Sequence, residues 1–417
     1  MTESRRGSLL VIFLTVFIDL LGFGMVLPLL PAYAQDFGAG LSKEQQGWLI
    51  GLLMASFSAM QFLFSPAWGK LSDRIGRRPV LMIGLAGSMI FYTLFGIASV
   101  YKSLLWLFVA RIGAGISGAT ISTAQAYIAD TTTLESRTKG MALIGAAFGL
   151  GFTFGPLFGY LALMDDPTHP GPGPGYAAAA LSAAALLLAF FKLPESLTVR
   201  GEHAERKSFG LASVGDALAT PSIGMLLVAT FVCVCGFATF ESTLSLFLKA
   251  ADGPFQFDYG DMLLIFAFVG LMLTVIQGGL VRRLAGKVPD VALASSGAVI
   301  EIIGFMLLAR APQVGTLGFL LVALGVVVTG FAFITPALNS MISRRSDPAK
   351  QGRILGVAQS VSSLARIFGP VIGARLFYLG STYQFWVAAA LMVLGLAMVL
   401  VAARSGHDYQ AAAAEVP

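Results

Sequence analysis

The stretch GKLSDRIGRR, residues 69–78, lies between two long apolar runs, residues 46–68 and 79–99. It contains four basic residues and one acid, whereas only 12% of the whole chain is charged. Charge this dense between apolar segments of spanning length is typical of a turn at a membrane face. The stretch therefore predicts that two membrane helices meet there, with Gly69 and Gly76 permitting a tight turn.

The composition indicates a protein that crosses a membrane many times. Hydrophobic residues make up 56% of the 417 residues, and the 12% charged share is far below the roughly 25% of soluble domains. The formal net charge of +5 comes from cations in short segments between apolar runs, which indicates membrane topology and not a nucleic-acid site. Cys233 and Cys235 point to different faces of one helix, so we expect neither a disulfide nor a metal pair.

Apolar runs predict twelve transmembrane helices, because about 20 apolar residues cross a bilayer. If the N-terminus is cytoplasmic, most Lys and Arg residues fall in segments on the cytoplasmic side, so both termini are expected in the cytoplasm. The expected location is a bacterial inner membrane. The first run is longer than a signal-peptide core, so we expect no cleaved leader. The runs are residues 9–33, 46–68, 79–99, 103–129, 140–163, 176–193, 222–248, 261–284, 289–309, 314–342, 352–378 and 383–403.

A long hydrophilic connection, residues 194–216, divides the predicted helices six and six. Its mixed charges, Glu195 among them, are interpreted as a solvated linker with no chemistry of its own. We therefore predict an N-terminal bundle at 1–193, a C-terminal bundle at 217–404 and a short cytoplasmic tail at 405–417. The expected fold class is an all-α membrane protein with two six-helix pseudo-repeat bundles.

Internal sequence similarity supports the interpretation of the two halves as repeats. The Gly-Pro pairs at 155–156 and 369–370 align at an offset that also superposes their neighbours. At a similar offset, the charged stretch aligns with residues 279–287, a less well preserved copy in which Arg283 takes the position of Asp73. Transporters built from such repeats bind their substrate between the halves, near the bilayer midplane.

Five charged residues stand out in the interior of the predicted spans, where an ionised side chain costs about 2.5–3.5 kcal/mol on insertion. By depth, Asp19 and Arg111 fall near the midplane. Loss of water favours a protonated carboxyl group and a nearby cation favours the ionised one, so the approach of Arg111 would let Asp19 release a proton. The alternative is a permanent structural ion pair. The five residues are Asp19, Arg111, Glu241, Glu301 and Arg366.

The fourth predicted span carries a small and polar face at helical spacing. It consists of Arg111, Gly115, Gly118, Ser122 and Gln125. Such a face lines either a close helix contact, which the glycines favour, or a watery cavity, which the polar side chains favour.

The fifth predicted span is rich in glycine, with Gly151, Gly155 and Gly159 on a smooth surface. Pro156 removes one hydrogen bond within this helix and predicts a kink. Tight helix packing and a pliable hinge between the halves are both compatible with this pattern.

Together these motifs resemble those of the major facilitator superfamily, and within it the drug/proton antiporters of the tetracycline-efflux type. The charged stretch is similar to the loop between their second and third helices. The first helix is similar in residues 19–22 (DLLG) and 28–31 (PLLP), Arg111 with Gly115 matches their fourth-helix motif, and residues 151–159 match their fifth-helix antiporter motif. The resemblance covers essentially the whole chain. It implies that Asp19 and Arg111 take part in proton coupling and that Gly155-Pro156 shapes the antiporter helix.

The charged stretch is also predicted to act as a conformational gate. Asp73 can pair with Arg77 and point at the start of the eleventh span near Gly352, where unpaired backbone amides favour an anion. Asp130 resembles the acid that joins this arrangement in relatives. The stretch would then hold the two halves together when the transporter is open outward. The gate residues are Gly69, Asp73, Arg74, Gly76, Arg77 and Asp130.

The second half offers further candidates for a cavity. Glu241 is interpreted as a site for a cationic substrate, as a second proton carrier or as a group at the wet outer end of its span. Arg366 is interpreted as a charge that balances Glu241 or attracts an anion, or as a structural contact, and Glu301 has no assigned role. Phe and Met near the acids line an adaptable cavity or simply fill packing. The cavity candidates are Phe23, Met25, Ser122, Gln125, Phe237, Glu241, Gln277, Asn339, Gln359 and Arg366.

The sequence thus predicts a secondary transporter that works by alternating access, with a proton gradient as its energy source and no cofactor or metal. Export of small amphipathic organic compounds or drugs is favoured, and uptake of an organic anion, sugar or other metabolite is the alternative. An enzyme is disfavoured because we find no nucleotide-binding loop or metal-ligand cluster in the sequence, and a sensor because the segment after Arg404 is short. We expect a monomer whose partners are a small-molecule substrate, protons and lipid.

Overall fold

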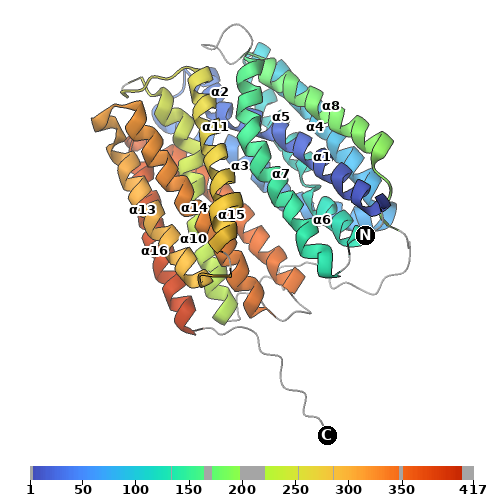
Figure 1. The fold of residues 1–417 in the computed structure, drawn as a ribbon. Helices are drawn as coiled ribbons and strands as arrows, with labels where there is room; N and C mark the ends of the chain where they lie inside the picture. Colours follow the sequence, from blue (N-terminus) through green and yellow to red (C-terminus); the bar gives the residue numbers. More distant parts are fainter. Residues whose placement is uncertain are drawn as a thin grey trace. The chain divides into compact units, whose positions relative to one another are not determined.

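In the computed structural model, the described residues form a series of helices (Figure 1). Within the described residues, twelve segments are long and apolar enough to cross a membrane. The predicted all-α fold with twelve spans is confirmed. The structure describes residues 3–132, 134–163, 171–197, 221–251, 253–284, 286–346 and 351–405, with the side chains of 3–8, 134–142, 221–222, 351–353 and 405 excepted.

Most spans are single helices, and the first, fourth and eighth are interrupted. The first comprises α1 (Glu3–Val26), η1 (Leu27–Leu29) and α2 (Leu30–Phe37), the fourth α5 (Leu104–Gly118) and α6 (Ile121–Thr131), and the eighth α11 (Tyr259–Val275), the π-helical turn η2 (Ile276–Val281) and α12 (Arg282–Leu284). The others are α3 (Lys43–Ile75), α4 (Arg77–Val100), α7 (Leu134–Ala162), α8 (Gly173–Lys192), α10 (Pro221–Lys249), α13 (Asp290–Val314), α14 (Leu317–Arg345), α15 (Gln351–Leu379) and α16 (Tyr383–Ser405).

The interruptions of the first and fourth spans have different causes. In the first, Pro28 and Pro31 lack the N–H groups that would continue the helix, and the chain tightens into the 3-10 turn η1. The fourth span has no proline, and its freed carbonyl oxygens accept hydrogen bonds from side chains of α3 instead. The donors are Trp68 Nε1 to Ile116 O at 2.7 Å, Gln61 Nε2 to Gly118 O at 3.2 Å and Ser65 Oγ to Ala119 O at 3.1 Å.

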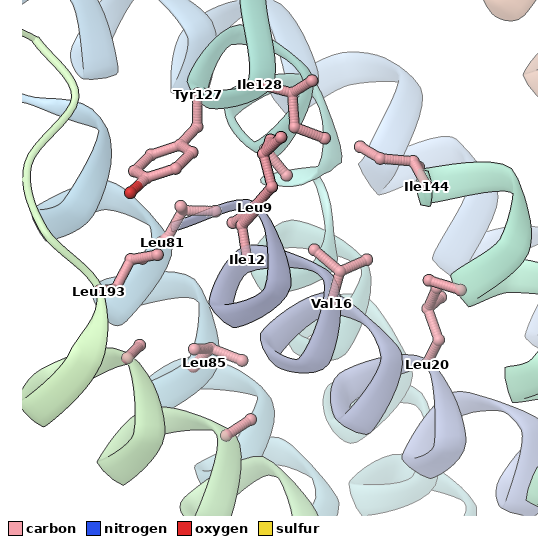
Figure 2. Packing of buried hydrophobic residues seen from close by; sticks show 14 residues of the cluster. Leu9, Ile12, Val16, Leu20, Leu81, Leu85, Tyr127, Ile128, Ile144 and Leu193 are labelled. Carbon is pink, nitrogen blue, oxygen red and sulfur yellow. The ribbon is translucent and has the colours of Figure 1, made fainter. Parts of the chain in front are cut away.

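The chain divides into two compact units, Met1–Ala204 with Leu244–Thr274, and Glu205–Thr243 with Val275–Pro417. The core of the first unit is built around α1, whose apolar side chains recur at helical spacing (Figure 2). Leu9, Ile12, Val16 and Leu20 pack with Leu81 and Leu85 of α4, Tyr127 and Ile128 of α6, Ile144 of α7, and Leu193.

Most of the expected linker at residues 194–216 lies outside the described residues. The predicted domain boundaries therefore stay a prediction.

In the second unit, α13 and α14 pack so closely that small residues are required between them. A Cβ atom on Gly330 would lie 2.6 Å from the Cβ of Glu301. The helix α10 also packs against α14 through aromatic rings, since Phe237 stacks on Phe331 with ring centroids 3.7 Å apart. Glu301 is completely buried, and neither of its carboxyl oxygens has a hydrogen-bond partner among the described residues. The acid is therefore part of the packed interior.

Substitution of Gly330 by Ala should destabilise the protein by about 1–3 kcal/mol, because the added methyl group overpacks the contact with α13. Thermal unfolding in detergent measures the effect. Gly318→Ala in the same helix is the control, since a Cβ atom there meets nothing within 4 Å. Equal unfolding midpoints for the two variants would contradict the close packing.

Candidate transport site

Asp19 lies on α1, half-buried, with hydroxyl groups as its neighbours. Ser182 Oγ of α8 donates a hydrogen bond to Asp19 Oδ1 at 3.2 Å, and Ser88 of α4 also interacts with this carboxyl group. Neutral donors can serve the ionised acid, and their hydroxyl oxygens can accept from the protonated one. Asp19 can therefore change its protonation state without breaking an ion pair.

Arg111 lies on α5 and is only 1% exposed. Its Cζ atom lies 4.5 Å from the ring centroid of Phe57 and 6.0 Å from that of Phe23, which gives the cation two aromatic faces. Among the described residues, its Nε and Nη1 atoms have no hydrogen-bond partner. A buried guanidinium with unused donors favours the arrival of an anion.

The structure does not bring Asp19 and Arg111 into an ion pair with each other. Among the described residues, the acid contacts hydroxyl groups and the cation contacts aromatic rings. Tyr92 of α4, which is 4% exposed, lies near both charged groups. The two residues thus share one region of the first unit while their charges remain apart.

Instead of the expected loop, the charged stretch contains one break between two helices. The loop expected at residues 69–78 is wrong except at Gly76, because α3 continues through Gly69 to Ile75 and α4 begins at Arg77. Gly76, between them, has a φ of 110°, which non-glycine residues rarely adopt. The tight turn therefore depends on Gly76 alone.

The charged side chains around this break form a cluster, as predicted. Arg77 is 4% exposed, its Nη1 lies 2.6 Å from Asp73 Oδ1, and its Nε donates to Asp130 Oδ2 at 3.1 Å. Ser72 Oγ accepts a further bond from Nη1 at 2.6 Å. Arg74 is exposed and outside the cluster. The expected contact of Asp73 with the eleventh span involves residues 351–353, whose side chains lie outside the described residues, and stays a prediction.

The glycines of α7 allow its backbone to touch α1. A Cβ atom on Gly155 would lie 2.7 Å from the Cα of Gly24, and one on Gly151 would lie 2.9 Å from the Cβ of Leu20. Gly159 has Leu263 of α11 at 3.3 Å from its Cβ position. These glycines therefore serve close packing, one of the two functions expected of them.

Pro156 leaves the carbonyl of Phe152 without its usual partner in α7. A Cβ atom on Gly270 of α11 would lie 2.4 Å from this oxygen, so only glycine can approach it. Beside this contact, the hydroxyl groups of Thr153 and Thr274 lie 2.9 Å apart. The region of α7 around Pro156 is thus held by α11 through backbone and hydroxyl contacts.

Residues 12–370 match the Major Facilitator Superfamily. The chain belongs to this family of membrane transporters. It is 31% identical to the class C tetracycline resistance protein of Escherichia coli, over 95% of each chain, and 30% identical to major facilitator superfamily domain-containing protein 10 of Mus musculus, over 94% of this chain and 92% of that one. The crystal structure of the human organic anion transporter MFSD10 superposes with a TM-score of 0.71 at 27% identity, covering 96% of this chain and 100% of the other.

As a member of this family, the protein is a multi-pass membrane transporter and not an enzyme. Its candidate cavity residues range from buried to exposed. Met25 and Phe237 are buried in helix packing, and Ser122 Oγ donates to the backbone oxygens of Ser65 and Ala119, both at 3.3 Å. Gln125, Asn339 and Gln359 are exposed, while Phe23 and Gln277 are half-buried, Gln277 within the π-helical turn.

In the second unit of the transporter, the structure brings Glu241 and Arg366 together. Arg366 Nη1 lies 3.5 Å from Glu241 Oε2, with side chains 41% and 18% exposed, respectively. Of the alternatives for these residues, the geometry fits a balanced charge pair. Their role in substrate binding stays a prediction.

One residue that contacts the cluster of Ser72, Asp73, Arg77 and Asp130, which we call the signature cluster, was not identified from the sequence. The interpretation of Glu195 as part of a linker without chemistry is wrong, because its carboxylate accepts hydrogen bonds from the backbone N–H groups of Arg77 and Arg78 at 2.9 and 3.2 Å. A helix that begins after Gly76 has no side chain at its N-cap to accept hydrogen bonds from its first N–H groups. This missing acceptor was the feature of the sequence that could have indicated a capping residue elsewhere in the chain.

We expect Glu241→Gln and Arg366→Gln to be non-additive in a double-mutant cycle of thermal unfolding. Because Arg366 is 41% exposed, the coupling should be about 0.5–1 kcal/mol, as for partly screened pairs. Pairing Glu241→Gln with Arg310→Gln, an exposed cation on α13, supplies an additive control. Additivity in both cycles would mean that the ion pair contributes nothing to stability.

Proposed function

We propose that the protein exports small amphipathic organic compounds in exchange for protons. The observation that carries this proposal is Asp19, a half-buried carboxyl group within a span whose described partners are hydroxyl groups. Such a group can take up a proton while it keeps its hydrogen bonds. The similarity to a tetracycline resistance protein supports a drug-like substrate.

Arg111 provides the second step of the proposed cycle. Its unpartnered Nε and Nη1 atoms would form charge-assisted hydrogen bonds with a carboxylate that moved within reach. We propose that Asp19 approaches Arg111 in another state of the transporter and then releases its proton. Their separation here supports an exchange of partners over a permanent ion pair.

The signature cluster is proposed as the gate of the cycle. Arg77 holds Asp73 and Asp130 from a buried position, while the side chain of Asp73 is 52% exposed. We propose that this exposed anion binds the unpaired backbone amides at the start of the eleventh span when the transporter is open outward. We further propose a monomer with halves at 1–193 and 217–404 and with both termini in the cytoplasm of a bacterium.

Transport of an organic anion is a second candidate, and Arg111 is the observation that favours it. The donors that would accept the carboxylate of Asp19 would equally accept one carried by a substrate, with Phe57 and Phe23 beside it for an aromatic part. The similarity to a structure described as an organic anion transporter supports this reading.

Proteoliposomes with an imposed pH gradient and a clamped membrane potential distinguish these functions. Tetracycline, ethidium and benzoate serve as neutral to zwitterionic, cationic and anionic probes. Antiport predicts that a probe moves opposite to the proton flux, whereas movement with the protons favours uptake. Absence of gradient-driven movement for all three probes would contradict proton-coupled export of this range of compounds.

Asp19→Asn should abolish gradient-driven transport and leave substrate counterflow, because an amide cannot carry the proton but preserves the shape of the site. The measurement is accumulation with a pH gradient against exchange without one. Asp36→Asn, at an exposed carboxylate of the same span, is the matched control and should retain both activities. Full accumulation by Asp19→Asn would remove this residue from the proton path.

Asp73→Asn should lower the maximal transport rate several-fold while the KM changes little, because the proposed gate acts on the conformational cycle and not on the substrate. Initial rates of counterflow over a range of probe concentrations give both constants. Arg74→Gln, which removes an exposed charge beside the cluster, should have the smaller effect. An unchanged rate for Asp73→Asn would leave the stretch with a role in topology only.

A further inference from the structure

The first turn of α4 begins without a capping side chain of its own. Gly76 occupies the N-cap position, so the backbone N–H groups of Arg77 and Arg78 have no local acceptor. Two arginine side chains at the positive end of a helix dipole add an unfavourable charge. An anion from elsewhere in the chain is required to compensate for both effects.

Glu195 supplies this anion from the segment that follows α8. Its Oε1 accepts from Arg77 N at 2.9 Å and its Oε2 accepts from Arg78 N at 3.2 Å. Oε1 also accepts from the N–H groups of Ser196 and Leu197, at 2.9 and 3.1 Å, which orient the carboxylate. One carboxylate thus satisfies donors at the start of a helix 118 residues away.

Gly76 provides the space that this cap needs. A Cβ atom at position 76 would lie 2.3 Å from Glu195 Oε2, well inside van der Waals contact. The positive φ of Gly76 turns the chain, and its missing side chain admits the carboxylate. Any larger residue would therefore have two effects, because it would both strain the turn and displace Glu195.

The segment at 194–197, which we call the strap, also contacts the side-chain partner of Arg77. Ser196 Oγ donates to Asp130 Oδ2 at 3.3 Å, the same oxygen that accepts from Arg77 Nε. At the other end of the strap, Tyr127 Oη donates to Pro194 O at 3.0 Å. The strap therefore binds both the backbone of Arg77 and the acid that holds its guanidinium.

We propose that Glu195 is a positioning residue of the transport cycle, which fixes the start of α4 and thereby aims the Arg77 guanidinium at Asp73 and Asp130. This inference rests on the gate role proposed for the cluster. It gives the beginning of the connection between the two halves a defined task in that gate. The Glu195 carboxylate touches no substrate and acts only through Arg77.

Hydrogen exchange on the full-length protein in detergent tests the cap without any substrate. Glu195→Ala should speed exchange in the peptide that covers the first turn of α4 about fivefold, the size expected for the loss of one helix cap. Glu195→Asp should restore part of the protection. Asp261→Ala, at an exposed acid in the first turn of α11, should leave this peptide unchanged. Unchanged exchange in Glu195→Ala would overturn the cap.

A double-mutant cycle separates positioning from simple capping. The cap bonds reach the backbone of Arg77, so in Arg77→Gln they persist, and a purely structural cap gives additive shifts of the unfolding midpoint. If Glu195 acts by aiming the guanidinium, Glu195→Ala should lower the midpoint by about 2 °C in the wild type and by clearly less in the Arg77→Gln background. Additive shifts would overturn the positioning role.

Transport gives the third measurement. Glu195→Ala should reduce the maximal rate of tetracycline counterflow about as much as Asp73→Asn does, with little change in KM, and Glu195→Asp should recover part of the rate. A normal rate in Glu195→Ala alongside a slowed Asp73→Asn would overturn the inference and keep the proposed gate. Normal rates in both would overturn the gate itself, whatever the exchange and unfolding experiments give.

Discussion

The structure depends on one constraint, which is that backbone polar groups within a membrane must find partners inside the protein. Uninterrupted helices meet this constraint by themselves, and each interruption needs a compensating contact. The break between α5 and α6 is compensated by Trp68, Gln61 and Ser65, whose side chains bind the freed carbonyl oxygens. A helix end at the membrane face has the same need for acceptors, and Glu195 supplies them at the start of α4. Irregular backbone thus occurs where a neighbouring element can supply the missing hydrogen bonds.

The sequence was sufficient for the features that depend on local pattern. Spanning segments follow from apolar length, so the twelve helices and the family fold were predictable. The pairing of Asp73 with Arg77 was also predictable, because these opposite charges lie only four residues apart, on either side of the turn at Gly76. The Gly-rich face of α7 likewise indicated close packing before its contact with Gly24 was known.

Features that depend on distant segments could not be predicted in the same way. Glu195 lies in a polar segment whose composition is that of any solvated connection, and only the fold brings it to Gly76. No proline marks the break after Gly118 in the sequence, because the side chains that donate hydrogen bonds to the interrupted backbone belong to α3. The partners of Asp19 and Arg111 were equally invisible, because hydroxyl groups and aromatic rings are common in every apolar span. The positions of the charges inside the spans were readable from the sequence, whereas the neutral groups that surround Asp19 and Arg111 were not.

Glu301 has a consequence for how the protein is made. A carboxyl group in the middle of α13 opposes the entry of that helix into lipid as an isolated segment. The following helix begins within a few residues, at Leu317, and carries the glycine against which Glu301 rests. Entry of α13 and α14 as a paired hairpin would shield the acid from lipid from the outset. We therefore expect the biosynthetic insertion of α13 to await the synthesis of its neighbour.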